Sequence, residues 1–374
     1  MVICSVYFTS FGLFIRKDYP YHHLLKYMVK RRVSLKDIAT ELGVSISTVS
    51  RGLRDHPDIS GELIRRIKAL AASHNYSPNP MAMGLLKQRT KMIGVIVPDL
   101  VTHFFSSVIS GIEEVAKEHG YFVIISPSNE SYLKEKENIG NLMKARVEGF
   151  IVCLSQETSD YTHFEQITEA EIPLVFFDRV CMKEQVPTVV ADSFKAAREI
   201  TRHFYENRAT RIAYISGPDH LNISDERRRG YLQGLSDCGL EFCAEYLETC
   251  NLSPDSAAKA TQRLLSLPTP PDAIFGINDT VVFAAMKEIR RFGLQIPDDI
   301  MVVGFTDEFH ATVVHPMLTS VMHPAREMGR VAAGLFFELT QNMNIPPKSI
   351  EMETKLVIRE SSVRGGAKNG EGAS

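Results

Sequence analysis

From residue 91 onwards, apolar runs of strand length alternate with amphipathic stretches of helix length. The first half of this alternation predicts buried strands, with helices between them, at 91–100, 121–127, 150–155 and 172–178. After Asp192 the same rhythm restarts, and it continues to Asp307. Repeated β–α units build parallel sheets covered by helices, so the restart predicts a second sheet. We therefore expect an α/β domain made of two doubly wound parallel-sheet lobes.

Polar and aromatic side chains gather where the predicted strands end. Ligands of parallel sheets bind at the carboxyl ends of the strands, and two facing lobes enclose a cleft that can close by hinging. Aromatic faces combined with Asp, Asn and Arg suit a polyhydroxylated ligand, so we predict a small-molecule effector of the carbohydrate class. Each side chain has an alternative role in capping a helix or packing in the core, which we expect for Asp279 and Phe105. The candidates are Phe104, Phe105, Ser155, Gln156, Asp178, Arg179, Asn278, Asp279, Thr306 and Asp307.

Three short helices are predicted between residues 34 and 73. The apolar residues of the first follow the spacing of one helical face, at Leu35, Ile38, Ala39 and Leu42. Ser34, Ser45 and Ser60 are placed to cap the three helices at their N-termini. Gly43 permits the left-handed turn that ends the first helix. Short helices that share one small core form a helix-turn-helix unit.

The outer face of the second helix carries short hydroxyl side chains and one arginine, at Ile46, Ser47, Thr48, Ser50 and Arg51. Arginine can pair bidentately with guanine, hydroxyl groups can bond to bases or phosphates, and an apolar group can contact a thymine methyl. The pattern therefore favours insertion into the major groove of double-stranded DNA. A helical module that contacts another protein remains the alternative.

Charge is unevenly distributed along the chain. The net charge is −3, but residues 28–91 hold 12 Lys and Arg against 5 Asp and Glu, a balance of +7. Residues 1–27 add +2, so the remainder carries −12. A small basic head on a large acidic body is expected when one end of a protein meets a polyanion.

Several other classes of protein are disfavoured. No apolar run reaches the roughly 18 to 20 residues of a membrane helix. The six cysteines form no CxxC pair, which argues against a zinc site or a disulfide scaffold and for a reducing cytoplasm. The chain contains no P-loop, GxSxG, HExxH or GxGxxG motif, so we expect neither an enzyme nor a cofactor.

The segment VSLKDIATELGVSISTVSRGLRDHPDISGELIRRIKALAASHNYSPNPMAMGLL resembles the DNA-binding head of the LacI/GalR family of bacterial repressors. By position, the resemblance implies that Ile46, Ser47 and Arg51 read bases. It also implies a set of residues that hold phosphates or cap helices, namely Ser45, Thr48, Ser50 and Asn75.

The resemblance further implies a hinge helix that forms on operator DNA, with Leu85 wedged into the minor groove. An isolated helix of about eight residues is unstable in water, and Gly84 weakens it further. Met83 stands where the family often has arginine, which would remove a phosphate contact. A plain linker is the alternative for this stretch.

The later segments IGVIVPDL, SGP, IND and VVGF resemble, in their order, the periplasmic-binding-protein-like effector domain of the same family. The resemblance covers about Met28 to Arg359, and it implies that Arg227 clamps the ligand. Thr306 departs from the family, which has an acid there, so we expect less negative charge in the cleft and no standard sugar assignment.

We therefore expect a ligand-responsive transcription regulator that binds a near-palindromic operator as a homodimer. The expected organisation is a leader at 1–27 upstream of a start at Met28, a head at 28–77, a hinge at 78–90, an effector-binding and dimerisation domain at 91–360 and a disordered tail at 361–374. The alternative is a secreted or periplasmic solute-binding protein without DNA-binding activity.

Overall fold

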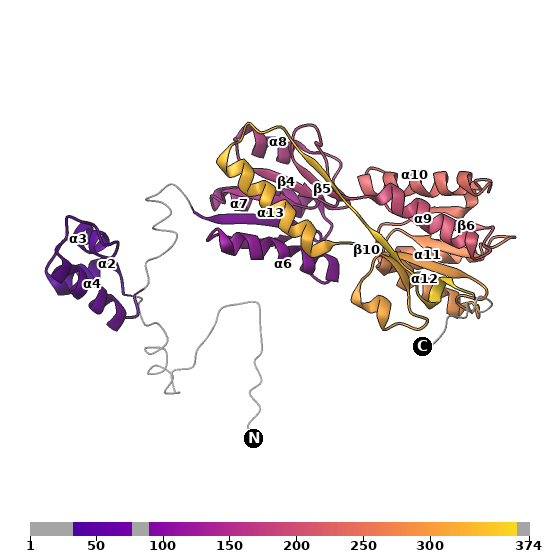
Figure 1. The fold of residues 1–374 in the computed structure, drawn as a ribbon, viewed down its shortest axis with the longest axis horizontal. Coiled ribbons are helices and arrows are strands. Elements are labelled where there is room, and N and C mark those ends of the chain that lie inside the picture. The colour runs from indigo at the N-terminus through magenta and orange to yellow at the C-terminus, as the bar shows by residue number, and fades with distance from the viewer. Residues whose placement is uncertain (1–32, 77–89, 365–374) are drawn as a thin grey trace, which may run out of the picture. The chain divides into compact units, whose positions relative to one another are not determined.

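The computed structural model describes residues 33–76 and 90–364. The chain divides between Met83 and Gly84 into a head and a body (Figure 1). The predicted leader and residues 78–89 of the predicted hinge, including Leu85, lie outside the described residues.

The described part of the head contains three helices, α2 (Leu35–Leu42), α3 (Ile46–Gly52) and α4 (Gly61–Ser73). The predicted serine caps are confirmed, because the side chains of Ser34, Ser45 and Ser60 each accept a hydrogen bond from the backbone of the following turn. Gly43 ends α2 in the left-handed region, at φ 69°. These local signals fix the lengths of α2 and α3 and the turn between them.

The three helices of the head share one small core. Its buried members are Ile38, Ala39, Val49, Ile67 and Ala71. Helix α3 approaches α4 closely at Gly52, where an added Cβ would lie 2.4 Å from Ile67 Cδ1. This packing buries one face of α3 and leaves the opposite face exposed.

The first lobe of the body contains a six-stranded parallel sheet in the order β11-β5-β4-β3-β1-β2. Its strands are β1 (Met92–Val97), β2 (Phe122–Pro127), β3 (Gly149–Val152), β4 (Leu174–Phe177), β5 (Thr188–Ala191) and β11 (Ser349–Met352). Helices α6 (His103–Glu118) and α13 (Ala325–Gln341) contribute to the core on one face of this sheet. Helices α7 (Tyr132–Lys144) and α8 (Thr162–Glu169) contribute to the core on the other.

The second lobe contains a six-stranded sheet in the order β12-β10-β9-β8-β6-β7. Its strands are β6 (Ile212–Ser216), β7 (Leu247–Thr249), β8 (Ala273–Gly276), β9 (Met301–Thr306), β10 (Thr319–Met322) and β12 (Lys355–Val357). All described pairs are parallel except β10 with β12, which is antiparallel. The helices of this lobe are α9 (Ser193–Glu206), α10 (Asn222–Asp237), α11 (Pro254–Leu265) and α12 (Asp279–Arg291), with short 3₁₀ turns at Ala244–Tyr246, Phe309–Thr312 and Glu360–Ser362.

The expected fold, two doubly wound lobes after a helical head, is confirmed, and the lobes are joined by three crossings of the chain. The chain leaves the first lobe after β5, returns after β10 to form α13 and β11, and crosses again to β12 (Figure 1). In the first lobe, α6 and α13 pack closely enough that a Cβ on Gly111 would lie 2.0 Å from the carbonyl oxygen of Arg326. The three chain crossings between the lobes place the carboxyl ends of both sheets around one cleft.

The prediction of a disordered tail from residue 361 is wrong at its start. Ser361 and Ser362 are both fully buried, and Ser361 Oγ donates to the carbonyl oxygen of Val302 at 2.7 Å. Because these hydroxyls are satisfied within the second lobe, the ordered chain continues to at least Arg364. Residues 365–374 lie outside the described part of the chain.

Candidate functional site

The exposed face of α3 separates the predicted DNA contacts into two groups. Ile46 is 48% exposed, and Ser47 and Arg51 are exposed as well. The hydroxyl of Ser45 accepts from the backbone N–H of Thr48 at 3.0 Å, so its main role is to cap the helix. Ile46, Ser47 and Arg51 are therefore the most exposed of the predicted contacts on α3, although the Ser47 hydroxyl also lies 2.7 Å from that of Ser45.

Thr48 and Ser50 are less exposed, and each has a hydrogen-bonded neighbour. The Thr48 hydroxyl lies 2.8 Å from that of Ser45, and Ser50 Oγ accepts from Arg54 Nη2 at 3.2 Å. Both side chains are half-buried, which suits contacts to the DNA backbone better than insertion between bases.

Arg51 has one weak partner among the described residues. Its Nη1 lies 4.0 Å from Asp58 Oδ2, and both side chains are more than half exposed. Exposed pairs of this kind contribute about 0 to 1 kcal/mol, so the guanidinium can leave Asp58 for a base.

Asn75 follows the end of α4 and adopts a left-handed backbone conformation, at φ 49°. Its N–H donates to the carbonyl oxygen of Ala72 at 3.0 Å. This geometry ends the helix, and the exposed side chain remains free to reach a phosphate.

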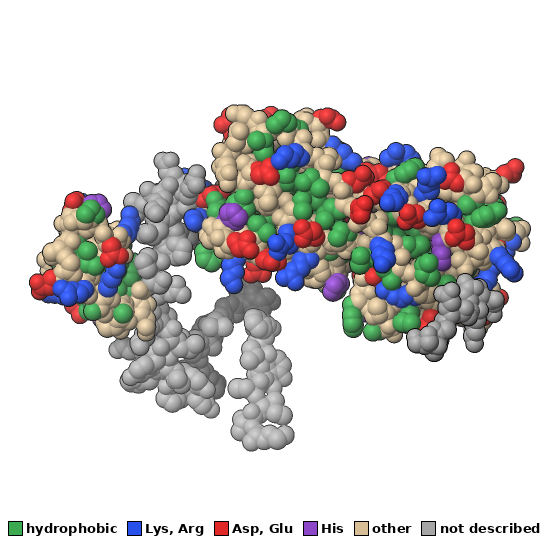
Figure 2. Space-filling view, viewed as in Figure 1, with side chains coloured by type: hydrophobic (Ala, Val, Ile, Leu, Met, Phe, Trp, Pro, Cys, Tyr) green, Lys and Arg blue, Asp and Glu red, His purple; other side chains and the backbone are tan. Residues whose placement is uncertain are grey.

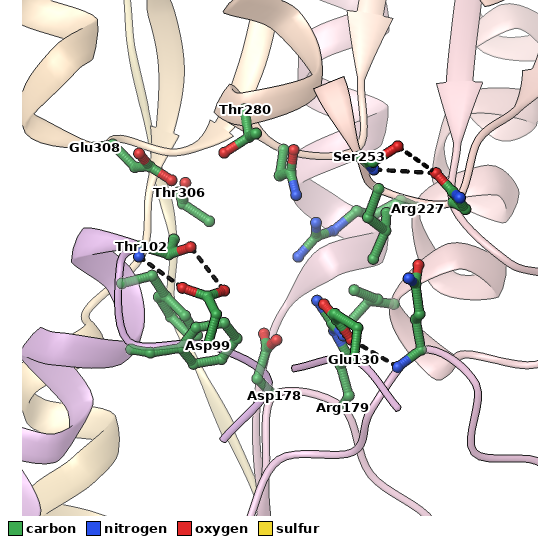
Figure 3. Close-up of a pocket in the computed structure, with 17 residues that line it drawn as sticks. Asp99, Thr102, Glu130, Asp178, Arg179, Arg227, Ser253, Thr280, Thr306 and Glu308 are labelled. Carbon is green, nitrogen blue, oxygen red and sulfur yellow. Dashed lines mark hydrogen bonds and ion pairs between the residues drawn. The ribbon is translucent and has the colours of Figure 1, made fainter. Parts of the chain in front are cut away.

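A cavity of about 200 Å³ lies between the two lobes of the body (Figure 3). Most of the predicted ligand residues line it, namely Phe104, Phe105, Asp178, Arg179, Arg227, Asn278 and Thr306, together with Gln156. Phe104 and Phe105 also belong to the core of the first lobe, so the expected core role of Phe105 and its cleft role coexist.

Ser155 does not line the cavity, so its prediction as a ligand contact is wrong. Its side chain is fully buried and turns toward α7, where Ser155 Oγ donates to Glu135 Oε2 at 2.8 Å. Thr158 Oγ1 donates to Oε1 of the same carboxylate at 2.7 Å, and His163 Nε2 lies 3.0 Å from it. The buried carboxylate needs these donors, and it therefore holds the loop on which Gln156 faces the cleft.

The prediction that Asp279 caps α12 is also wrong. The cap is Asn278, whose Oδ1 accepts from Val281 N at 2.8 Å. Asp279 is buried in the first turn, where Oδ1 accepts from Ser320 Oγ at 2.6 Å and Oδ2 accepts from Glu308 N at 2.7 Å. Asp279 thus holds the loop after β9 from behind the cleft.

Two buried charged residues of the first lobe, Asp178 and Arg179, follow the end of β4. Arg179 Nη1 donates to Glu130 Oε2 at 2.8 Å, and although burial opposes its charge, the neighbouring Glu130 keeps the pKa of Arg179 raised. Burial raises the pKa of the Asp178 carboxyl, while the charges of Arg227 and Arg179 offset part of that rise. Asp178 is therefore a carboxyl that gains from a donor on a ligand.

The expectation of less negative charge than in the family stays a prediction, but the cleft itself is acidic. Asp99, Glu130, Asp178 and Glu308 all line the cavity together with Thr306. These four carboxyl groups outnumber the two guanidinium groups of the lining. By contrast, the face of the body in Figure 2 mixes acidic and basic side chains over its surface.

The backbone is strained at the edge of the cleft. Thr306 has φ 114°, Asp307 has φ 54° and Asp178 has φ 56°. A β-branched residue with positive φ is unusual and costs on the order of 1 to 3 kcal/mol. Asp307 is anchored because its Oδ1 accepts from Arg359 Nη1 at 2.6 Å. Strain kept at a binding edge is typical of positions selected for function.

The two lobes contact each other beside the cleft through Asn222. Asn222 Oδ1 accepts from Val180 N at 2.9 Å, and its Nδ2 donates to the carbonyl oxygen of Asp178 at 3.0 Å. In addition, His220 Nε2 lies 2.6 Å from the carbonyl oxygen of Gln156. These bonds join α10 of the second lobe, and the turn before it, to the segments that follow strands β3 and β4 of the first.

Several lining residues were missed by the sequence reasoning. They are Asp99, Thr102, Glu130, Ile223, Asn251, Leu252, Ser253, Thr280 and Glu308. Glu130 and Asn251 follow β2 and β7, so their positions after strands are the signal that points to them. Glu308 lies two residues beyond β9, and no signal in the sequence places its side chain in the cleft.

Within residues 33–76 and 90–364, no group of three or more His, Cys, Asp or Glu side chains is placed to hold a metal ion. In the same residues, no helix has the length and apolar character to cross a membrane.

Both parts of the chain match known families. The family described as bacterial regulatory proteins, lacI family, matches residues 34–79. The family described as periplasmic binding proteins and sugar binding domain of LacI family matches residues 90–360.

Curated relatives cover almost the whole length of the chain. The HTH-type transcriptional repressor CytR of Escherichia coli K12 is 31% identical over 329 residues, which are 88% of this chain and 96% of that repressor. The ribose operon repressor of Bacillus subtilis 168 is 28% identical over 329 residues, which are 88% of this chain and 98% of its own. Both relatives are repressors and not enzymes.

Solved structures show the same architecture. The lac repressor dimer bound to operator and the anti-inducer ONPF matches with a TM-score of 0.77 and 25% identity, over 89% of this chain and 100% of its own. The complex of the transcriptional regulator CelR with cellobiose matches with a TM-score of 0.68 and 27% identity, over 88% of this chain and 100% of its own.

Proposed function

The chain belongs to the LacI family of bacterial regulatory proteins, and from this premise we propose that it is a transcription regulator whose hold on an operator is controlled by a small molecule in the cleft. The observation that carries the proposal is the presence, in one chain, of a capped recognition helix with exposed Ile46, Ser47 and Arg51 and of a polar cleft between two lobes. A solute-binding protein would have the cleft but no use for the head, so that alternative is not favoured.

The head supplies sequence recognition. Arg51 is proposed to pair with a guanine, Ser47 to bond to a base edge, and Ile46 to contact a thymine methyl. Ser45, Thr48, Ser50 and Asn75 are proposed to orient the helix through phosphates, and Leu85 to wedge into the minor groove. Operator binding would place the protein in the cytoplasm.

The regulator is proposed to act as a homodimer on a near-palindromic site, because two heads related by a twofold axis read two half-sites. The body offers apolar surface for such pairing. Strand β2 lies at the edge of its sheet, with Phe122 64% exposed and Ile125 41% exposed. Exposed apolar edges of this kind are commonly covered by a partner.

The effector is proposed to be a polyhydroxylated small molecule. Arg227, Asn278 and Asp178 offer donors and acceptors from both lobes, and the lining includes the rings of Phe104 and Phe105. A ligand that contacts both lobes stabilises the closed cleft. If closure also changes the spacing of the heads, ligand and operator affinities are reciprocally linked.

Selection of duplexes from a random pool by the purified full chain tests the proposal. We expect a near-palindromic consensus, bound far more tightly than a scrambled duplex and with an affinity that falls as salt rises. Duplex binding with no consensus would reject the proposed function.

A further inference from the structure

The Glu308 carboxylate is an acceptor that the described part of the protein leaves without a hydrogen-bond donor. The residue is only 7% exposed, and it lines the cleft. The exposed His310 is its only ion-pair neighbour within 4 Å among the described residues, and His310 Nδ1 lies 3.9 Å from Glu308 Oε2, beyond hydrogen-bonding distance. A carboxylate buried to this degree is costly unless a partner donates to it.

The position of Glu308 is fixed by its backbone. Its N–H donates to Asp279 Oδ2 at 2.7 Å, and its carbonyl oxygen accepts from Ala311 N at 2.8 Å. The preceding residues Thr306 and Asp307 hold positive φ angles that turn the chain toward the cleft. The carboxylate is therefore presented to a ligand without further ordering of the loop.

The two guanidinium groups of the cleft do not neutralise Glu308. Arg179 is engaged by Glu130. Arg227 donates to the carbonyl oxygen of Ile277 and stacks on Phe305, with its guanidinium carbon 3.6 Å from the ring centre. Figure 3 shows the Arg227 guanidinium pointing into the cavity from the side opposite Glu308, and no hydrogen bond or ion pair joins the two side chains among the described residues.

Asp99 adds a second negative charge on the same side of the cavity, and it comes from the other lobe (Figure 3). Asp99 Oδ2 accepts from Thr102 Oγ1 at 2.9 Å, and Asp99 Oδ1 accepts from Thr102 N at 2.7 Å. These two hydrogen bonds hold the Asp99 carboxylate in place. Burial and the charge of Asp99 both raise the pKa of Glu308. Two carboxyl groups from opposite lobes repel each other when the cleft closes, unless a positive group lies between them.

We propose that Glu308 is the specificity-determining residue of the cleft and that the effector is a polyhydroxylated molecule with a protonated amino group, which lies between Glu308 and Asp99. The ammonium donates to Glu308, neutralises the repulsion and so favours closure, while the hydroxyl groups meet Arg227, Asn278 and Asp178. A phosphorylated ligand would add negative charge to a lining that already has an excess of carboxyl groups. The inference rests on the proposed function and deepens it by naming the class of effector.

Calorimetric titration of the full chain with matched hexoses tests the inference. Glucose, galactose and mannose are each compared as the free sugar, the 2-amino sugar, the N-acetylated amino sugar and the 6-phosphate. We expect at least one amino sugar to bind about tenfold or more tightly than its neutral parent, because charge-assisted hydrogen bonds are roughly twice as strong as neutral ones. Acetylation, which removes the charge, should abolish the gain.

Equal or tighter binding of a neutral parent or a phosphate would overturn the inference, as would the absence of binding by every amino sugar. Glu308→Gln keeps the shape of the side chain and removes its charge, so it should abolish the preference for the amino sugar. Glu241→Gln makes the same change of charge at an exposed position of the second lobe and should leave the preference intact. If the Glu308→Gln variant still prefers the amino sugar to its neutral parent, the inference is also contradicted.

The same preparation separates this inference from the proposed function. If the chain binds its selected duplex and responds to a neutral sugar, the inference fails and the proposed function stands. If the chain selects no duplex yet prefers the amino sugar, the proposed function fails and the assignment of Glu308 stands.

Discussion

The guanidinium of Arg227 lies over the Phe305 ring, with its central carbon 3.6 Å from the ring centre. Arg227 is only 2% exposed, and its Nε donates to Ser193 Oγ at 3.3 Å. Burial lowers the pKa of Arg227, while the negative charge of Asp178 counteracts that effect. This arrangement fixes a positive charge at the floor of the cleft. The N–H groups of Arg227 that have no protein acceptor can donate to a ligand there.

Replacement of Arg227 by lysine is expected to weaken ligand binding by about tenfold or more. Lysine keeps the charge but has neither the planar face that stacks on Phe305 nor the forked donors. Calorimetry with the best ligand of the hexose series measures the loss. Arg229→Lys on the same helix is the control, because Arg229 is exposed and pairs with Asp225 at 2.9 Å. Equal affinities of the two variants would remove Arg227 from the site.

The stability of the body is expected to depend on pH through Asp279. Burial raises the pKa of this carboxyl to about 7, and hydrogen bonds from Ser320 and from the backbone of Glu308 offset part of the rise. Because the folded-state pKa exceeds the unfolded value, the folded state holds the proton more tightly. Asp279 therefore stabilises the fold at low pH, and this contribution is lost as pH rises toward 7.

In the Asp279→Asn variant the side chain is neutral at every pH. Comparison with the wild type therefore isolates the pH-dependent contribution of Asp279 to stability. Between pH 5.5 and 8.5 the wild type should lose about 2 kcal/mol of unfolding free energy relative to the variant. Denaturant unfolding at the two pH values measures the difference. The buried His203 and His323 have lowered pKa values, but they are present in both proteins and cancel in the comparison. Parallel pH profiles would show that Asp279 does not titrate in this range.

The close crossing of α6 and α13 is expected to tolerate no side chain at Gly111. A Cβ there would lie 2.0 Å from the backbone oxygen of Arg326, so Gly111→Ala must separate the helices, at a cost of about 3 kcal/mol. Gly140→Ala is the matched control, because no atom lies within 4 Å of its added Cβ in α7. That change should stabilise the body by about 0.5 to 1 kcal/mol, as alanine favours helix more than glycine does. Denaturant unfolding of both variants checks the two signs.

The head could be predicted from the sequence because its determinants are local. The capping serines lie within three residues of the N–H groups that they accept, and Gly43 ends its helix without help from distant residues. The return of α13 and β11 to the first lobe could not be predicted in the same way. Strand β11 pairs Ser349 with Thr188, and a pairing over that separation depends on the assembled sheet.

From the sequence, only the strand ends that line the cleft could be predicted. The rule for parallel sheets places Asp178, Asn278 and Thr306 at the right edge, but it does not give the direction of a side chain. Ser155 turns away because the buried Glu135 requires its donor. Glu308 enters because the positive φ angles of the preceding residues redirect the chain, which the sequence alone does not reveal.

The role of α3 in reading DNA sequence is tested most directly by the affinity of the Arg51→Ala variant for the selected operator, measured by fluorescence anisotropy beside a scrambled duplex. We expect a loss of about 1 to 3 kcal/mol on the operator, a much smaller loss on the scrambled duplex and unchanged ligand binding in the cleft. Arg66→Ala, at an exposed position of α4, removes the same charge and should retain the discrimination between duplexes. Equal losses on both duplexes after Arg51→Ala would contradict the assignment of α3 as the helix that reads DNA sequence.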